Sequence, residues 1–303
     1  MKIELPKIGK VILLLCGILG MHCCNALKYS GQKGDYFGQT LPGQEAEIFM
    51  PNVISLPDRG EYSIAFSSDG NECYFSCYQN NSSSIYYAQR VNNTWERPSE
   101  VTFSNTIKFD LSSLSDDGNT ILLENGNDIW IAERKDGLWS EPKRLLSPIN
   151  SASNDHGYSI TSDGVVYISS SRPNGSGNSF EIWRVLPSSD RAESLGTIVN
   201  SNLRNLTPCI ARDGSYIIFT QSDTSYEYLC VSFYQGGNQW TEPVNMNIAG
   251  ARINIATYQN RPTLSPDGKF LFFNSHDSNN ADKSDIYWVN ADVIEGIRIE
   301  VLK

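Results

Sequence analysis

The most regular feature of the chain is a turn followed at once by an apolar run, and this pattern occurs five times. A small or polar residue pair leads into Asp-Gly, and aromatic and β-branched residues follow, which favours strands over helices. The shared aspartates are 48, 46, 50 and 54 residues apart. A period near 50 residues with several short strands is typical of one blade of a β-propeller. The copies are SSDGNECYFS (67–76), SDDGNTILLE (115–124), TSDGVVYISS (161–170), ARDGSYIIFT (211–220) and SPDGKFLFFN (265–274).

Each copy contains further strand-like segments. A short apolar segment precedes every Asp-Gly, and a third segment follows the apolar run, as in DIWIAER (128–134) and DIYWVN (285–290). A fourth segment opens with Trp-x-x-Pro at 95–98, 139–142 and 240–243. Because proline cannot donate to a strand ladder, it belongs on an edge, and the outermost strand of a blade is an edge. The third copy lacks Trp-x-x-Pro, and the fourth has EYL where the others have an Asp-Ile type start.

The Asp-Gly pairs are predicted to build the hairpins between first and second strands. Glycine supplies positive φ at little conformational cost, and Asp-Gly is a strong hairpin signal. A residue that every copy needs usually serves the fold, so the structural interpretation is preferred to catalysis or calcium binding. The aspartates concerned are Asp69, Asp117, Asp163, Asp213 and Asp267.

The strand count predicts how such a ring closes. The fifth copy has three strands and then ADVIEGIRIEVLK, without a Trp-x-x-Pro segment, whereas EIFMPNVIS (47–55) has the features of a fourth strand with no first three before it. Joining both ends in one blade would hide the exposed strand edges. We therefore expect an all-β fold over residues 47–303: a five-bladed β-propeller of four-stranded blades, closed by the N-terminal strand, with residues 27–46 as a linker.

At this point the chain resembles a known family. The repeated S-x-D-G turn with an aromatic run and the D-I-[YW] third strand are similar to the WD-like repeats of TolB-type β-propellers, and the Trp-x-x-Pro segments resemble bacterial secreted members. The resemblance covers about 240 residues. It implies an extracytoplasmic binding or scaffold domain and specifies no catalytic residue.

Residues 1–26 have the composition of an export signal. Lys2, Lys7 and Lys10 precede VILLLCGILG (11–20), which is too short to span a bilayer comfortably. The three alternatives are simple secretion with cleavage at Cys24-Asn25-Ala26, lipid attachment at Cys23 or Cys24, and an uncleaved anchor. Each predicts a location outside the cytoplasm: periplasm, cell surface or secreted.

The negative net charge of the chain disfavours some classes of binding partner. The chain has a net charge of −10, and residues 1–26 contribute three lysines against Glu4, or +2, so the remainder is near −12. An acidic surface disfavours nucleic acid and anionic lipid. We expect a monomer that binds a protein or a glycan, with membrane contact only through a possible lipid anchor.

Cysteine and histidine do not predict a cofactor. Cys73 and Cys77 lie four apart in one strand, roughly 13 Å, too far for a disulfide. Together with Cys209 and Cys230 they are interpreted as buried free thiols. His156 and His276 do not recur in a metal-binding spacing, so neither metal nor cofactor is expected.

Candidate ligand-binding residues come from the loops that lead into the first strands, where ring-shaped repeat proteins often carry function. Eight residues before the shared aspartates stand Glu61, Phe109, Asp155, Asn205 and Gln259, and seven before stand Tyr62, Asp110, His156, Leu206 and Asn260. The predicted ligand-binding set is Glu61, Tyr62, Asp110, Asp155, His156 and Arg261.

Two interpretations of this set stay open. The first is an extracytoplasmic binding or scaffold protein without catalysis, whose partner is unknown. The second is a carbohydrate-binding protein or glycoside hydrolase in which Glu61, Asp110 and Asp155 act as the carboxylates of five-bladed glycosidases. Against hydrolysis, these three residues occupy unequal offsets from the turn, and the Asn-Asp-Pro-Asn-Gly motif of invertase-like enzymes is missing.

Overall fold

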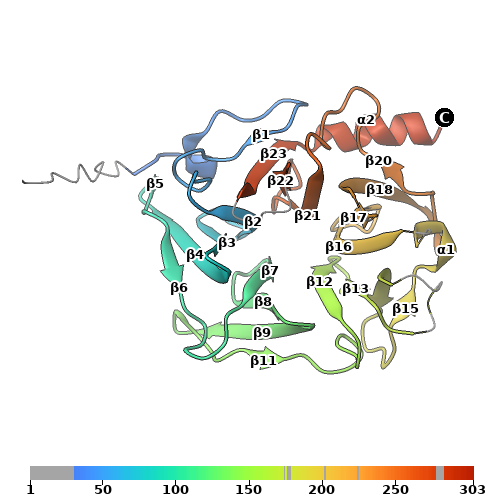
Figure 1. The fold of residues 1–303 in the computed structure, drawn as a ribbon, viewed down its shortest axis with the longest axis horizontal. Helices are drawn as coiled ribbons and strands as arrows, with labels where there is room; N and C mark the ends of the chain where they lie inside the picture. Colours follow the sequence, from blue (N-terminus) through green and yellow to red (C-terminus); the bar gives the residue numbers. More distant parts are fainter. Residues whose placement is uncertain (1–30, 174, 176–178, 201–202, 224, 278–282) are drawn as a thin grey trace, which may run out of the picture. The chain divides into compact units, whose positions relative to one another are not determined.

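The computed structural model describes residues 31–303 except 174, 176–178, 201–202, 224 and 278–282. Residues 1–30, which contain the expected export signal, lie outside the described part. Within the described residues the fold is all-β with a few helical segments (Figure 1). Among them there is no helix long and apolar enough to cross a membrane.

The five sequence repeats each form a unit of antiparallel strands. Unit one contains β2 (Gly60–Phe66), β3 (Glu72–Gln79), β4 (Ser82–Val91), β5 (Thr94–Trp95) and β6 (Ser99–Val101). Unit two contains β7 (Asp110–Leu114), β8 (Thr120–Asn125), β9 (Asp128–Lys135), β10 (Leu138–Trp139) and β11 (Lys143–Arg144). Unit three contains β12 (Asp155–Ile160), β13 (Val166–Ser170), β14 (Glu181–Val185) and β15 (Glu193–Ser194), followed by α1 (Gly196–Val199).

The last two units are joined by hydrogen bonds. Unit four contains β16 (Arg204–Ile210), β17 (Tyr216–Ser222), β18 (Glu227–Gly236), β19 (Gln239–Trp240) and β20 (Val244–Asn245). Unit five contains β21 (Tyr258–Leu264), β22 (Phe270–His276) and β23 (Asp285–Asn290). One parallel bridge, Glu227 to Tyr258, merges them, so the described residues form four hydrogen-bonded sheets and not five separate ones.

The first strand of every unit lies on the inside of the arrangement (Figure 1). These strands contact one another in cyclic order: β2 with β7, β7 with β12, β12 with β16, β16 with β21, and β21 with β2. Each one contains an irregularity of register against its second strand. In units three, four and five the residue six before the shared aspartate has positive φ: Gly157, Thr207 and Arg261. Such bulges redirect the side chains beside them.

The Asp-Gly turns have the structural role that the sequence predicts. In unit one, the Ser67 hydroxyl donates to Asp69 Oδ1 at 2.6 Å, and the Asn71 N–H donates to the same oxygen at 3.0 Å. Gly70 has φ 66°, and its N–H donates to the Ser67 carbonyl at 2.8 Å. The hydrogen bond from the Ser67 hydroxyl, and to a smaller extent that from the Asn71 N–H, holds the pKa of Asp69 below its usual range. Only the glycine needs the left-handed region, because Asp69 itself has ordinary φ.

The Trp-x-x-Pro segments differ in detail from a simple fourth strand. Trp95, Trp139 and Trp240 each lie in a two-residue strand that pairs with the end of the third strand. The proline then interrupts pairing because it lacks an N–H. Pairing with the third strand resumes in β6, β11 and β20.

The N-terminal part of the described chain pairs with the C-terminal unit. Strand β1 is shorter than the expected 47–55, comprising Glu47–Ile48, and it pairs antiparallel with β23. The Phe49 N–H donates to the Ile286 carbonyl at 2.8 Å, after which Met50 turns away with positive φ. The segment before it, expected to be a linker, includes the single turn η1 (Asp35–Gly38), whose Phe37 is fully buried and stacks on Trp95 with ring centroids 4.0 Å apart.

The C-terminal end forms a helix that was not expected. Helix α2 (Asp292–Val301) buries Val293, Ile294 and Ile297 in a core cluster with residues of units four and five. The apolar positions recur at helical spacing over only three turns, a window too short to stand out in a strand-rich sequence.

All four described cysteines are buried and free.

Candidate functional site

Two adjacent positions in each first strand have different surroundings. The residues eight before the shared aspartates (Glu61, Phe109, Asp155, Asn205, Gln259) are all buried. The residues seven before (Tyr62, Asp110, His156, Leu206, Asn260) are all half-buried. We call the first group the inner layer and the second group the mouth layer.

The inner-layer carboxylates are enclosed by their own partners. Glu61 is fully buried, and Arg59 Nε lies 2.6 Å from its Oε1. Burial raises the pKa of Glu61 to about 8, although Arg59 acts in the opposite direction. The Leu56 N–H also donates to Glu61, at 3.3 Å. These contacts tie Glu61 to the chain segment that precedes its own strand.

Asp155 is equally enclosed. Its Oδ1 accepts from the Ser170 hydroxyl at 2.5 Å and from Arg172 Nη2 at 2.6 Å. Its Oδ2 accepts from the backbone N–H of Ser151 at 2.6 Å and from the Ser151 hydroxyl at 2.8 Å. Each carboxylate oxygen of Asp155 accepts two hydrogen bonds, and the side chain has no exposed surface. Asp155 therefore holds its neighbouring loops together.

The mouth layer forms a network across units. The Tyr62 hydroxyl of unit one bonds to Asp110 Oδ1 of unit two and to Ser83 Oγ at 2.9 Å. The guanidinium of Arg261, from unit five, lies over the Tyr62 ring with its carbon 5.3 Å from the centroid. Burial, and after it the Asp110 carboxylate, raises the pKa of Tyr62, so the hydroxyl stays protonated. Three of the six predicted residues are thereby brought together.

A further carboxylate completes this network. Glu124 Oε2 lies 3.2 Å from Arg261 Nη2 and 3.7 Å from His156 Nδ1, and its Oε1 accepts from the Gly157 N–H at 2.8 Å. Burial alone would raise the pKa of Glu124, but Arg261, His156 and the Gly157 N–H hold it at about 2. Glu124 is therefore a carboxylate at neutral pH, and the cluster of Tyr62, Asp110, Glu124, His156 and Arg261 is called the mouth cluster.

Glu124 was missing from the predicted set, although the sequence contains a signal for it. The residues seven after the shared aspartates are Ser76, Glu124, Ser170, Thr220 and Asn274. Only unit two has a charged side chain at this position of the second strand. Glu124 also stands directly opposite Asp110 in the β7–β8 ladder. Like charges in such a pair repel, and Arg261 lies close enough to Glu124 to offset that repulsion.

The backbone of units three to five positions the cluster. Gly157 has φ 62°, and a Cβ there would lie 2.9 Å from Pro208 Cδ and 3.0 Å from Thr207 Cα. The Arg261 N–H donates to Thr207 Oγ1 at 3.3 Å, and that hydroxyl bonds to Thr220 Oγ1 at 3.0 Å. A β-branched residue with positive φ, such as Thr207, is an uncommon and strained conformation. The three bulges thus pack directly on one another beside the cluster.

Two hollows adjoin the mouth cluster. Toward the Asp-Gly turns, a cavity with about 70 Å³ of space for water is lined by Glu124, Arg261 and first-strand residues that include Ser63, Ser159 and Thr207. Ser63 Oγ is buried and has no hydrogen-bond partner among the described residues. A polar space of this size suits ordered water.

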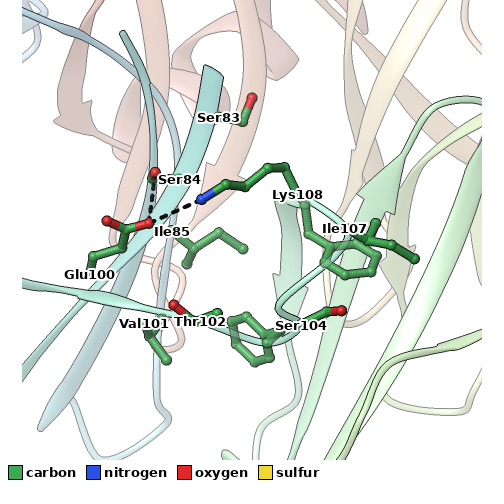
Figure 2. A pocket seen from close by; sticks show the side chains of 11 residues that line it. Ser83, Ser84, Ile85, Glu100, Val101, Thr102, Ser104, Ile107 and Lys108 are labelled. Atoms are coloured by element: carbon green, nitrogen blue, oxygen red, sulfur yellow. Dashed lines mark hydrogen bonds and ion pairs between the residues drawn. The ribbon is translucent and has the colours of Figure 1, made fainter.

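The second hollow lies between β4, β6 and the loop that leads to β7 (Figure 2). In it the Ser84 hydroxyl donates to Glu100 Oε1 at 2.9 Å, and Lys108 Nζ lies 3.5 Å from the same oxygen. Ser83, which bonds to Tyr62, lines this hollow too. The hollow is therefore a neighbour of the mouth cluster.

No metal site accompanies these groups. Over the described part of the chain, no three His, Cys, Asp or Glu side chains are grouped so that they could hold a metal ion. The cluster can accept and donate several hydrogen bonds at once and combines two carboxylates with one guanidinium and one imidazole. Such a composition is suited to a polar ligand with many hydroxyl groups.

Comparisons with known proteins show the fold. No family model matches the chain. No curated protein sequence matches it either. Among solved structures, a GH62 hydrolase in complex with xylotriose aligns with a TM-score of 0.52 at 9% identity, covering 86% of this chain and 98% of that one. The α-L-arabinofuranosidase PaAbf62A from Podospora anserina aligns with a TM-score of 0.51 at 8% identity, covering 81% and 95%.

TolB from Acinetobacter baumannii aligns with a TM-score of 0.49 at 16% identity. That alignment covers 78% of this chain and 53% of TolB, so the chain matches about half the length of that protein. At these identities the likenesses show the fold alone, an all-β fold of the β-propeller type.

Proposed function

We propose that this chain is an exported, TolB-like β-propeller that acts by binding a polyhydroxylated ligand, a glycan, at the mouth cluster. The repeated Asp-Gly turns and third strands support the family, and the apolar segment at 11–20 supports export. The observation that carries the binding function is the convergence of Tyr62, Asp110, Glu124, His156 and Arg261, which come from four repeat units, on one network.

The proposed architecture is a closed ring of five blades. The cyclic contacts of the five first strands and the pairing of β1 with β23 support closure. Phe37 and Phe49 are fully buried beside that pairing. Deletion of residues 31–55 would then expose the edge of β23 and abolish a single cooperative unfolding transition in calorimetry. A truncated chain that unfolds like the full one would contradict ring closure.

Binding is favoured over hydrolysis by the protonation states in the cluster. A glycosidase needs a carboxylic acid with a raised pKa as proton donor. The pKa of Glu124 is held at about 2, and Glu61, whose pKa is raised to about 8, is fully buried behind Arg59. Neither of these two glutamates is therefore suited to act as the proton donor at neutral pH.

Glycan-array binding tests the proposal, followed by calorimetry with the best ligand. Asp110→Ala is expected to weaken binding at least tenfold, because it removes the acceptor that orients Tyr62. Asp190→Ala is the matched control, since its side chain is 94% exposed and lies away from the cluster. Retention of no glycan, or equal affinity of the wild type and Asp110→Ala, would reject the mouth as a glycan site.

Hydrolysis stays a second candidate because Asp110 and Glu124 face each other across one ladder. It requires turnover of plant or host polysaccharides by the purified protein. Loss of that turnover in Asp110→Asn, with folding unchanged, would support it. The catalytic roles that the sequence predicts for Glu61 and Asp155 are tested in the same assay by Glu61→Gln and Asp155→Asn.

A further inference from the structure

The tryptophan of each Trp-x-x-Pro segment packs into the junction between its own unit and the preceding one. The Trp139 ring of unit two lies 6.0 Å from Tyr74 and 5.8 Å from Phe103, both in unit one. Trp240 of unit four lies 6.4 Å from Tyr167 of unit three. Trp95 of unit one belongs to the core cluster that contains Phe272 of unit five.

Units three and five lack this tryptophan, and they differ in what replaces it. In unit five, α2 supplies the apolar side chains: Ile294 and Ile297 share a core cluster with Ile218 of unit four. In unit three, β14 ends at Val185, and Leu186 and Pro187 follow without a helix. The short α1 lies on the other side, because its Val199 packs in the cluster of units three and four.

The junction between units two and three contains a packed core cluster, but an open groove borders that cluster. A groove of about 370 Å³ lies there, lined mainly by apolar side chains that include Leu122, Ile131, Ile160, Val166, Val185 and Leu186. Leu122 is five residues after its shared aspartate, as Tyr74 is in unit one, where that ring meets Trp139. Ile160 and Leu186 are 42% and 38% exposed at its rim. We call this hollow the unit-three groove.

The lining chemistry and the strand edge define what would occupy the groove. No charged side chain lines it, so an uncharged apolar ring complements it electrostatically. In units one, two and four the tryptophan residue also pairs its backbone with the end of the third strand. In unit three, β15 pairs with Trp183 and Arg184, so Val185, the last residue of β14, has no partner in β15, and the following Leu186 carbonyl accepts from the Ser189 N–H at 3.0 Å.

We propose that the unit-three groove is a docking site for an aromatic side chain, of indole size, presented by a partner protein. The partner side chain takes the position that Trp139 and Trp240 occupy in their own junctions. Its backbone lies beside the end of β14. This site is separate from the mouth cluster and does not depend on the glycan proposal.

A peptide from this chain provides a direct probe. Residues 137–143, Gly-Leu-Trp-Ser-Glu-Pro-Lys, contain the Trp-x-x-Pro segment. Titrated into the ¹⁵N-labelled protein, it is expected to shift the amide resonances of Ile160, Val166 and Leu186. The same peptide with Trp→Ala should bind at least tenfold more weakly. Equal binding of both peptides, or no shift with either, would overturn the proposal.

Variants separate the groove from general surface effects. Ile160→Asp and Leu186→Asp place a charge at the rim, where both side chains are partly exposed, so folding is kept and peptide binding is expected to be lost. Leu138→Asp, at a side chain 75% exposed and outside the groove, is the matched control and should bind like the wild type. Ile160→Trp should occupy the groove from within, raise the melting temperature and block the peptide.

A small aromatic compound tests whether the groove binds a side chain of a protein segment or a free aromatic molecule. N-acetyl-tryptophanamide is expected to bind at least tenfold more weakly than the peptide, because it cannot pair along β14. Equal affinity would show that the groove takes a small aromatic molecule, which contradicts docking of a protein segment. Unchanged peptide binding in Ile160→Trp would likewise reject the groove as the site.

Discussion

The inner layer and the mouth layer are adjacent in sequence but chemically opposite. Glu61 and Asp155 are fully buried and bonded to arginines of their own units. Asp110 and His156 are half-buried and bonded or close to residues of other units. Adjacent positions of a first strand thus have different roles. The inner-layer carboxylates stabilise their own unit, and the mouth-layer side chains contact other units.

The difference shows that a carboxylate's role is set by what surrounds it. The pKa of Glu61 is raised to about 8 by burial, whereas the pKa of Glu124 is held at about 2 despite burial, because Arg261 of another unit faces it. Both are glutamates on strands near the same centre. Only the second can present a negative charge to a ligand at neutral pH.

The largest expected effect contrasts Asp155→Ala with Asp110→Ala. Removing Asp155 leaves Arg172 and Ser170 without their buried acceptor, so the free energy of unfolding should fall by about 3–5 kcal/mol. Asp110→Ala should lower the free energy of unfolding by about 1 kcal/mol while weakening ligand binding at least tenfold. Urea denaturation of both variants measures this. A larger loss of stability in Asp110→Ala would break the distinction between the layers.

The next effect is a pair of opposite pH dependences. The Glu124 pKa is lowered, so its contribution to stability is present above pH 4.5 and is lost as the pH falls towards 2. The destabilisation by Glu124→Gln should therefore be largest at neutral pH, on the order of 3 kcal/mol, and shrink below pH 4.5.

The Glu61 pKa is raised, so the native state retains its proton more strongly than the unfolded state. The wild type therefore loses stability as the pH rises from 4.5 to 8. Glu61→Gln, which resembles the protonated form, should become more stable relative to the wild type over that range. Urea denaturation at several pH values measures both curves, and curves of the same sign would contradict the two environments.

A smaller effect concerns the backbone that positions the cluster. Gly157→Ala introduces a Cβ 3.0 Å from Thr207 Cα at a residue with φ 62°, and we expect a loss of about 2 kcal/mol together with weaker ligand binding. Gly126→Ala is the control, since Gly126 has nearly the same φ of 61° but open space around it. It should lose about 1 kcal/mol at most. Thermal unfolding compares the two, and equal losses would argue against close packing of the bulges.

The smallest expected effect is that of Tyr62→Phe. The variant removes the hydroxyl that joins Asp110 to Ser83 but keeps the ring under Arg261. Stability should fall by about 1 kcal/mol. The loss in the free energy of ligand binding should exceed the loss in the free energy of unfolding. Calorimetry measures the first and urea denaturation the second. Unchanged affinity would place the hydroxyl outside the binding surface.

Local chemistry allowed much of the fold to be predicted from the sequence. Asp-Gly turns and apolar runs depend on neighbours within about ten residues, so the hairpins at Asp69, Asp117 and Asp267 and the free cysteines follow directly. The predicted strand at 47–55 was too long, because the turn at Met50 depends on packing beside Phe49. Helix α2 was missed since its apolar face is meaningful only against units four and five.

The sequence by itself determined the repeat, its turns and the positions where side chains approach the centre. Only the tertiary structure decided which of these side chains meet. Glu124 and Arg261 are 137 residues apart and join across units, whereas Glu61 and Arg59, two residues apart, face away into the core. The physical reason is that charge interactions weaken with distance and depend on burial. Both quantities are set by how the units pack, and neither can be obtained from a residue's place in its own repeat.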